Sequence, residues 1–349
     1  MKLKRNLFMI AIIIVIACYL FSCTNGRPSI TLGNNLNNLY LLSRACDDEN
    51  YVYYVNNAGL MKISKGSGQI TDMGISTDNF LHGLNIIDGY LYLDTMETHG
   101  STVSVEPCKI NLSTGEISEM ASMGGAGGAA VIINEMIYFQ GISSSSFIYH
   151  RINKDGTGGA AFDDNRYRVL GVENNAIYAY VPEEENITEN GVTKSVSWIY
   201  RLSSNWKPEE KLFRLSFRSE GWNTFYVTFG GYVYVSEFNG YEAGADNYNF
   251  HIYRHRLAAN SEKEILFDSG YNWVYILAVT EDGVYFYYTN QIYAERDPAR
   301  SRSNIHRINH NGTGLRELPH NPASTDILFV SNIDGKFYGI TGDRIVLIE

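Results

Sequence analysis

The hydrophobic and polar positions of this chain recur in one short pattern, a turn followed by a tyrosine-rich strand. The pattern occurs seven times; the copies are Glu49–Tyr54, Asp88–Tyr92, Asn134–Tyr138, Asn174–Tyr178, Gly230–Tyr234, Asp282–Phe286 and Asp334–Tyr338. Their turns are rich in Asp, Asn and Gly, which tolerate the positive backbone angles of two-residue hairpin turns. Each copy therefore predicts a β-hairpin.

Further strands surround each copy. After most copies, apolar and polar residues alternate with a period near two, as in Ile148–Asn153 and Ile305–Asn309, which predicts a half-buried strand. A Gly-bearing turn and a short polar strand such as Lys211–Phe213 come next, and an apolar stretch precedes each tyrosine-rich strand. Four strands in a unit of about 40 to 56 residues are typical of a propeller blade. We therefore expect an all-β fold, a β-propeller of seven four-stranded blades, with six blades as the alternative.

The last unit supplies only three strands and ends with Arg344–Ile348. The segment Ser29–Leu32 precedes the first full unit and is the candidate for the missing outer strand of the last blade. Such a pairing would join the two ends of the chain and leave no blade with an open edge.

The N-terminus has the order of a signal peptide. Lys2, Lys4 and Arg5 precede the apolar run Leu7–Phe21, and small and polar residues follow. The run is shorter than the roughly 20 residues that a membrane-spanning helix needs. We expect a signal peptide at residues 1–22, an anchor linker and possible closing strand at 23–35, and the propeller domain at 36–349.

The segment Leu20-Phe21-Ser22-Cys23 resembles the lipobox of bacterial lipoproteins. The resemblance implies that Cys23 carries lipid, which would hold the protein on the extracytoplasmic face of the cell membrane. The alternative is an ordinary secreted protein in which Cys23 merely lies near the cleavage site.

The charge of the chain limits the classes of molecule that it is expected to bind. Loss of residues 1–22 removes three positive charges and takes the formal net charge from −10 to −13, which disfavours nucleic acid and anionic lipid as partners. Two cysteines, Cys46 and Cys108, then remain besides Cys23. They are compatible with a disulfide in an oxidising envelope and equally with two independent buried thiols.

The repeated units, clearest at Ile148–Gly156 and Ile305–Gly312, resemble the uncharacterised bacterial propeller domains of domain-of-unknown-function family 5050. These are related in pattern to receptor-type and TolB-type propellers. The resemblance extends from about Tyr51 to Tyr338 and implies a surface or envelope propeller. Its motifs are turns and strands, so it implies nothing about a ligand.

Signatures of catalysis are absent from the sequence: there is no Gly-x-Ser-x-Gly elbow, Walker loop or His-Glu-x-x-His motif. His251 and His255 are four apart on an expected strand, about 13 Å, too far to share a metal ion. We expect them, like His306 and His310, to be surface histidines.

No cofactor is expected, except that calcium is compatible with three acidic clusters, which are Asp47–Glu49, Glu183–Glu185 and the pair Asp163 and Asp164. The pair Asp163 and Asp164 is the best of the three, because Gly156 and Gly158 lie nearby.

Aromatic residues are abundant, with 26 Tyr, 16 Phe and 4 Trp, and most lie in the strand patterns, where they predict core. A minority lies in expected loops and is the candidate ligand-binding set: Trp206, Trp222, Tyr241, Tyr248, Trp273 and Tyr293. Long insertions at 181–197, 237–250 and 289–304 are expected to emerge as loops on one common face of the ring.

Two classes of function remain open. The preferred one is a non-enzymatic, membrane-tethered binding or interaction module for a glycan, a peptide or another envelope protein. The alternative is an envelope carbohydrate-active hydrolase or lyase, with carboxylates about 5 to 9.5 Å apart at the central channel.

Overall fold

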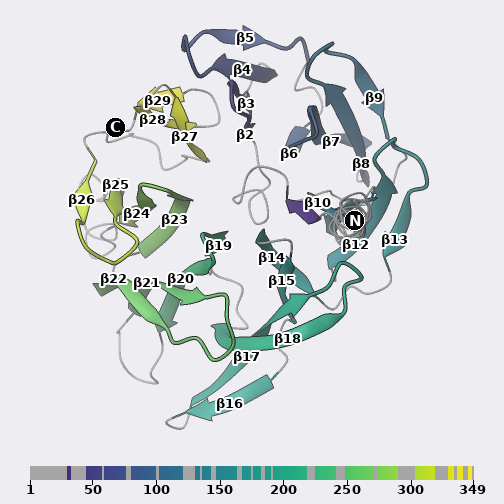
Figure 1. The fold of residues 1–349 in the computed structure, drawn as a ribbon. Coiled ribbons are helices and arrows are strands. Elements are labelled where there is room, and N and C mark those ends of the chain that lie inside the picture. Colours follow the sequence, from purple (N-terminus) through teal and green to yellow (C-terminus); the bar gives the residue numbers. More distant parts are fainter. Residues whose placement is uncertain are drawn as a thin grey trace, which may run out of the picture.

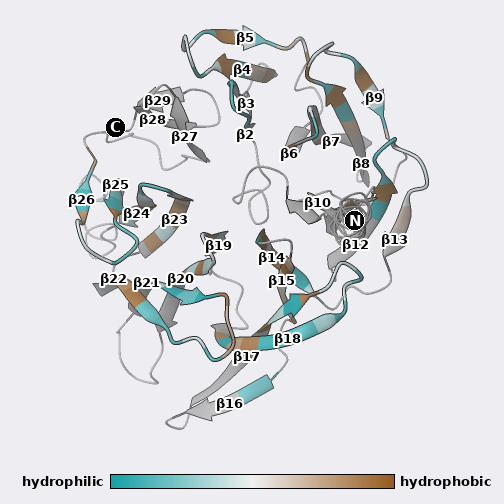
Figure 2. Ribbon diagram, in the orientation of Figure 1, coloured by the Kyte–Doolittle hydropathy of each residue, from teal (hydrophilic) through white to brown (hydrophobic). Residues whose placement is uncertain are grey.

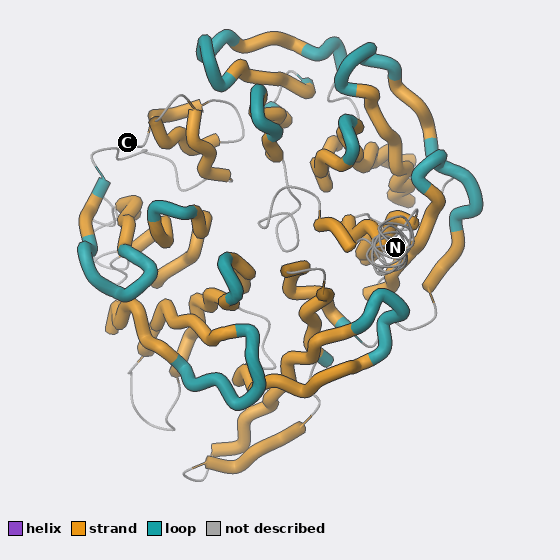
Figure 3. The backbone as a smooth tube through the Cα atoms, in the orientation of Figure 1, coloured by secondary structure: helices purple, strands orange, loops and turns teal. Residues whose placement is uncertain are grey.

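The structure is a computed structural model, and every element that it describes is a β-strand (Figure 3). The described residues are 30–32, 45–56, 59–75, 80–99, 102–120, 130–133, 136–142, 147–162, 167–173, 176–181, 185–189, 192–217, 225–240, 248–270, 273–289, 303–318, 329–333, 336–340 and 345–347. Within these ranges, no helix is long and apolar enough to cross a membrane.

The strands of the first half of the chain form three antiparallel sheets. The first contains β2 (Ala45–Asp47), β3 (Tyr51–Val55), β4 (Leu60–Ser64) and β5 (Ile70–Asp72). The second contains β6 (Phe80–Ile87), β7 (Tyr90–His99), β8 (Thr102–Asn111) and β9 (Ile117–Glu119). The third contains β10 (Ala130–Ile133), β11 (Met136–Ile142), β12 (Phe147–Asn153) and β13 (Ala160–Phe162), together with β1 (Ile30–Leu32).

Four further sheets follow. They contain β14 (Arg168–Glu173), β15 (Ala176–Tyr180), β16 (Glu185–Glu189), β17 (Val192–Leu202) and β18 (Pro208–Phe217); β19 (Phe225–Phe229), β20 (Tyr232–Gly240), β21 (Tyr248–Arg256) and β22 (Glu264–Gly270); β23 (Trp273–Thr280), β24 (Gly283–Thr289), β25 (Ser303–Ile308) and β26 (Arg316–Glu317); and β27 (Phe329–Ile333), β28 (Lys336–Ile340) and β29 (Ile345–Leu347).

The sheets stand side by side in a ring, and the first strand of each sheet in chain order lies nearest the axis (Figure 1). Inner strands of successive sheets contact one another, as β14 does β19, β19 does β23, and β23 does β27. The ring is completed by contact of β27 with β2, and of β2 with β6. This is the architecture of a β-propeller, so the all-β propeller prediction is confirmed.

The hydrophobic core lies between facing sheets, and apolar and polar residues alternate along many of the described strands (Figure 2). Apart from Met136 and Tyr138 of β11, the strand residues of the described clusters come from five sheets, those of β2–β5, β6–β9, β14–β18, β19–β22 and β23–β26. The described core thus accounts for five blades rather than the predicted seven. Cys46 and Cys108 belong to one of these clusters, and both are buried and not joined in a disulfide.

The short strand β1 differs from its predicted role. Ile30, Thr31 and Leu32 pair antiparallel with Ile133, Ile132 and Val131 of β10, at the inner edge of the third sheet. They do not supply the outer strand of the last sheet, where β29 pairs with β28. The first and last residues of β1 are apolar, and the pairing places β1 against the apolar strand β10 near the axis.

Two of the three predicted loop insertions are paired strands. Residues 185–189 and 192–196 form the hairpin β16–β17, which extends outside the ring (Figure 1). Residues 237–240 and 248–251 prolong the ladder between β20 and β21. In the third, 289–304, Thr289 pairs with Ser303, and residues 290–302 lie outside the described part of the chain. In β17, β20 and β21, apolar and polar residues continue to alternate beyond the expected end of the strand, and the strands are therefore longer than expected.

Neighbouring blades are joined where the turn between the third and fourth strands of one blade reaches the preceding blade. Trp206, in the turn between β17 and β18, is 1% exposed, and its ring centroid lies 5.3 Å from that of Tyr138 in β11. Trp206 also has a left-handed backbone, with φ of 59°. The ring is therefore a core contact, and its predicted role in ligand binding does not fit this burial.

Equivalent turns make the same kind of contact elsewhere. In the turn after β25, the His310 ring accepts a hydrogen bond from the Tyr234 hydroxyl of β20 through Nδ1 (2.8 Å) and donates one to the Thr280 carbonyl through Nε2 (2.8 Å). The carbonyl can only accept, which fixes this tautomer and makes the tyrosine the donor. Other turns contribute a pair of Lys154 with Asp88 and a bond from the Asn260 amide to the Leu212 carbonyl.

Blades β14–β18 and β19–β22 approach each other closely at Gly171. A Cβ atom at this position would overlap the Thr228 side chain of β19, whose hydroxyl is buried. The strand also carries a register irregularity between Val169 and Gly171, which lets its backbone bend toward the neighbour. Glycine at this position is thus required by the distance between two blades rather than by a turn.

Replacing Gly171 with Ala is expected to lower the free energy of unfolding by about 1 to 3 kcal/mol, because the added methyl overpacks the interface. Thermal or urea denaturation measures the loss. Adding Thr228→Gly should recover part of it, because that change removes the atoms with which the methyl overlaps. The control is Gly66→Ala, where nothing lies within 4 Å of the added atom; equal losses for Gly171→Ala and Gly66→Ala would contradict the prediction.

Candidate functional site

Most of the predicted site residues lie outside the described part of the chain; these are Cys23, Asp163, Asp164, Trp222, Tyr241 and Tyr293. Two others are placed by their backbones: Tyr248 is the first residue of β21, and Trp273 is the first residue of β23. Tyr248 pairs with Gly240 and Trp273 with Thr289. Both positions therefore lie at the end of the ladder where the second strand of a blade passes to the third.

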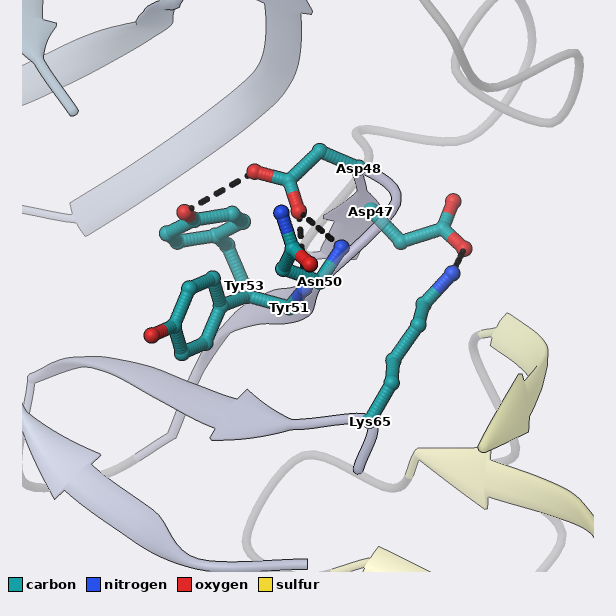
Figure 4. Close-up of polar contacts among 6 residues, drawn as sticks. All are labelled: Asp47, Asp48, Asn50, Tyr51, Tyr53 and Lys65. Carbon is teal, nitrogen blue, oxygen red and sulfur yellow. Dashed lines mark hydrogen bonds and ion pairs between the residues drawn. The ribbon is translucent and has the colours of Figure 1, made fainter. Parts of the chain in front are cut away.

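The acidic cluster at residues 47–49 forms a turn between β2 and β3 (Figure 4). One carboxylate oxygen of Asp48 accepts hydrogen bonds from the amides of Asn50 and Tyr51, each 2.7 Å, and the other accepts one from the Tyr53 hydroxyl at 3.1 Å. The carboxylate of Asp47 pairs with the Lys65 ammonium at 2.6 Å. These oxygens stabilise the hairpin, so the turn is a structural feature and a poor calcium site.

Glu185 is the described residue of the acidic cluster Glu183–Glu185, and it belongs to a different kind of site. Glu185 begins β16, and its carboxylate accepts a hydrogen bond from the indole N–H of Trp198 in β17, at 3.1 Å. The same oxygen lies 3.9 Å from the Arg214 guanidinium of β18. Three neighbouring strands thus bring an acid, a tryptophan and an arginine together on one face of the sheet.

A second cation completes this group. The Lys211 ammonium lies 4.2 Å from the Trp198 ring centroid, and the Arg214 guanidinium carbon lies 4.8 Å from it. Lys211 also lies 5.7 Å from the ring of Tyr200. Cations at such distances are attracted by the negative face of an aromatic ring. We call Glu185, Trp198, Tyr200, Lys211 and Arg214 the Trp198 patch.

The local sequence explains this placement. Along β17, Ile199 packs in the core against the next blade, whereas Trp198 and Tyr200, one residue to either side, point to the opposite face. Trp198 pairs directly with Arg214, and a register irregularity lets Tyr200 pair with Lys211. Trp198 and Tyr200 are partly exposed, and the side chains of Glu185 and Arg214 are 43% and 50% exposed. The patch is therefore open to solvent.

The sequence patterns missed this patch. Trp198 directly precedes the alternating strand predicted at Ile199–Leu202, where aromatic residues predict core, and Lys211 belongs to a predicted short polar strand. Alternation gives part of the signal, because Trp198 and Tyr200 lie on either side of the apolar Ile199. Lys211 and Arg214 are three residues apart and reach the same face only through a register irregularity, which the pattern does not reveal.

The histidines of β21 are buried, so their prediction as surface residues is wrong. His251 is 8% exposed and His255 is 6% exposed, because both point into the interface with the blade β14–β18. The His255 ring stacks on Phe213 of β18 with centroids 4.5 Å apart, and its Nδ1 donates to the Ser261 carbonyl at 3.2 Å. Burial lowers the pKa of His255 to about 4 and also lowers the pKa of His251.

His251 belongs to a row of polar side chains across three strands. Glu237, His251 and Asp268 face one another across β20, β21 and β22. The Glu237 carboxylate is 5% exposed and pairs with the Lys263 ammonium at 2.9 Å. It also accepts a hydrogen bond from Tyr253, whose pKa is raised by burial and then by that carboxylate. With its charge neutralised in this way, Glu237 joins β20 to β21 and to the turn after β21 within one blade.

Metal binding is not indicated at the Trp198 patch or at Glu237. In the described ranges, no group of three or more His, Cys, Asp and Glu side chains is arranged to hold a metal ion.

Comparisons with known proteins add the fold alone. No protein-family model matches the chain, so its resemblance to family 5050 stays a prediction. No curated protein matches it either. Among solved structures, the β-propeller domain of the Trilobed protease from Pyrococcus furiosus is similar, with 9% identity, a TM-score of 0.45, and coverage of 77% of this chain and 81% of that domain.

Two other similar structures are the N-terminal domain of Nup159 and the acylaminoacyl peptidase of Pyrococcus horikoshii. The first has 10% identity, a TM-score of 0.44, and coverage of 93% of this chain and 96% of that one. The second has 12% identity, a TM-score of 0.43, and coverage of 75% and 42%. The chain thus spans less than half of that peptidase, and none of these likenesses bears on activity.

Acidification is expected to destabilise the protein through His255. In the unfolded chain this histidine gains a proton below its ordinary pKa of 6.5, whereas in the folded chain it stays neutral until about pH 4. The unfolded state therefore binds the proton first, and the free energy of unfolding falls as pH drops from 6.5 to 4, by up to about 3 kcal/mol. Urea denaturation at several pH values measures this.

The variant His255→Gln isolates the effect, because it keeps a polar side chain that does not titrate. It should be less stable than the wild type at pH 7 and should lose less stability between pH 6.5 and pH 4. Parallel pH profiles for the two proteins would contradict the prediction.

Proposed function

We propose that this chain is a non-enzymatic binding or interaction module, tethered to the extracytoplasmic face of a membrane, whose ligand docks on the Trp198 patch. The observation that supports this proposal is a partly exposed indole with two cations near its ring, beside an extra hairpin that the other described sheets lack. Insertions in a repeated fold commonly form its binding surface. The ring supplies a rigid support, because β17 and β18 are anchored by the core behind the patch.

A glycan, a peptide and another envelope protein are the candidate ligands. Aromatic rings flanked by polar groups suit all three, because the ring face is apolar while its edge and neighbours form polar contacts. The alternative function, a carbohydrate-active hydrolase or lyase, has no comparable support. Glu185, Glu237 and Asp47 are each engaged by a cation of this chain.

The proposed tether is lipid on Cys23. The support is the resemblance of Leu20–Cys23 to a lipobox after an apolar run that is short for a membrane-spanning helix. Several acyl chains at about 0.8 kcal/mol per buried methylene would retain the protein at the membrane.

The proposal also extends to the ring. Besides the five blades of the described core, the sheet of β10–β13 with β1 and the sheet of β27–β29 would be blades of the same ring, seven in all. Their support is the contact of β1 with β14, of β23 with β27, and of β27 with β2.

Binding is tested with residues 23–349 on arrays of glycans and peptides. The wild type should bind at least one class, and Trp198→Ala should weaken binding by about tenfold, since stacking on an aromatic ring contributes about 1 to 3 kcal/mol. The matched control is Tyr51→Ala, which removes another aromatic ring with a cation, Lys62, 5.0 Å from its centroid. Binding that is absent from the wild type, or unchanged in Trp198→Ala, would contradict the proposal.

The tether is tested by labelling bacteria that express the full chain with radioactive palmitate. The wild type should incorporate label and remain with the membrane fraction, whereas Cys23→Ala should do neither, because it lacks the thiol that accepts lipid. Equal labelling of the two proteins would rule out lipidation at this cysteine.

A further inference from the structure

The Trp198 patch already holds a carboxylate that belongs to the chain itself. One oxygen of Glu185 is bound by the Trp198 indole N–H at 3.1 Å and lies 3.9 Å from the Arg214 guanidinium. An indole N–H and a guanidinium are both donors without acceptor capacity, so they require an electronegative partner. The position of Glu185 therefore marks where an anionic group is favourable on this surface.

The contact that holds Glu185 is weak enough to be exchanged. The Arg214 distance is that of a loose ion pair, and both side chains are about half exposed. Exposed pairs of this kind contribute about 0 to 1 kcal/mol. Moreover, β16 pairs only with β17 and Glu185 is its first residue, so displacing this side chain disturbs no part of the ring.

The surroundings of Trp198 favour a ligand recognised by side chains. An extended peptide usually binds by adding a strand to an open sheet edge. On one side of β17 only residues 197–198 lie between the residues that pair with β16 and those that pair with β15, and on the other side β17 pairs with β18, so there is no room on β17 itself to add a strand. Side chains stand roughly perpendicular to a sheet, so the patch presents an indole and charged groups on the face of the sheet, away from the outer edges of β16 and β18, and this suits a sugar ring better than a peptide that adds a strand.

We propose that the Trp198 patch binds a carboxylated sugar, whose carboxylate replaces that of Glu185 at Trp198 and Arg214. The apolar face of the sugar ring packs on the exposed part of the indole, and Lys211 adds a second positive charge nearby. This inference rests on the proposed function and names the class of its ligand. The acidic character of the whole chain opposes a long polyanion but is screened beyond about 8 to 10 Å in physiological salt, which favours short oligosaccharides.

The test is calorimetric titration of residues 23–349 with trigalacturonic acid, and with the neutral trisaccharide galactotriose. Glu185→Gln removes the competing charge and keeps a side-chain oxygen for the indole N–H. It should bind the acid about three- to fivefold more tightly than the wild type, the factor expected for release of a surface ion pair. Arg214→Ala and Trp198→Ala should bind it at least about tenfold more weakly.

The matched control is Glu209→Gln in β18, which pairs with Arg201 at 3.5 Å and contacts neither donor. It removes the same charge from the same sheet and should change the affinity less than twofold, which separates displacement of Glu185 from a general loss of negative charge. Galactotriose should bind more weakly than the acid and equally well to wild type and Glu185→Gln.

The outcomes separate this inference from the proposed function. Equal affinity of wild type and Glu185→Gln for the acid, or no binding of the acid to either, overturns the inference. So does tighter binding of hexaglutamate than of trigalacturonic acid, which would indicate an acidic peptide. In each case the proposed function stands if Trp198→Ala still loses the array ligand, and it falls only if that variant binds the ligand unchanged.

Discussion

The packing of each sheet against the next is the constraint on which the rest of this structure depends. A propeller blade has two faces to cover, and neither is covered within the blade itself. In this protein strand side chains supply most of the covering, and the turn between the third and fourth strands adds to it by carrying a large side chain onto the preceding blade. Trp206, His310 and Lys154 serve this role in three different blades, with stacking, hydrogen bonding and ion pairing respectively. The position of this side chain in the turn recurs from blade to blade, whereas the type of side chain and of contact varies.

The fold was predictable because its signals are local and repeated. Hairpin turns at Asp88–Gly89 and Gly230–Gly231, with positive backbone angles in the structure, divide the chain into strands that alternate along their length. What the sequence could not provide was the identity of the surface that each strand faces. His251 and His255 lie on a strand as expected, yet their side of β21 meets another blade, so they are buried. Residues 30–32 were likewise recognised as a strand, but their partner is set by the three-dimensional position of β10.

The candidate site shows the same limit more sharply. The aromatic residues of expected loops were given priority, and the one whose side chain is described, Trp206, fills a gap between blades. Trp198 was passed over because a tryptophan in an alternating strand usually faces a core. Its exposure follows from cross-strand pairing with Arg214 and from a bulge beside Tyr200, and single-sequence patterns do not determine such registers.

The strand β17 has two partners on one edge, since Ile199–Leu202 pair with β15 whereas residues 192–196 pair with β16. The inner part of the strand is thus committed to the blade, and Ser195 and Val196 also pair with β18. Hairpins of different length or composition beyond these residues are compatible with this arrangement, because residues 192–194 pair with β16 alone. Related chains would then be able to acquire a different recognition surface by changing this one hairpin, while the scaffold that carries it stays the same.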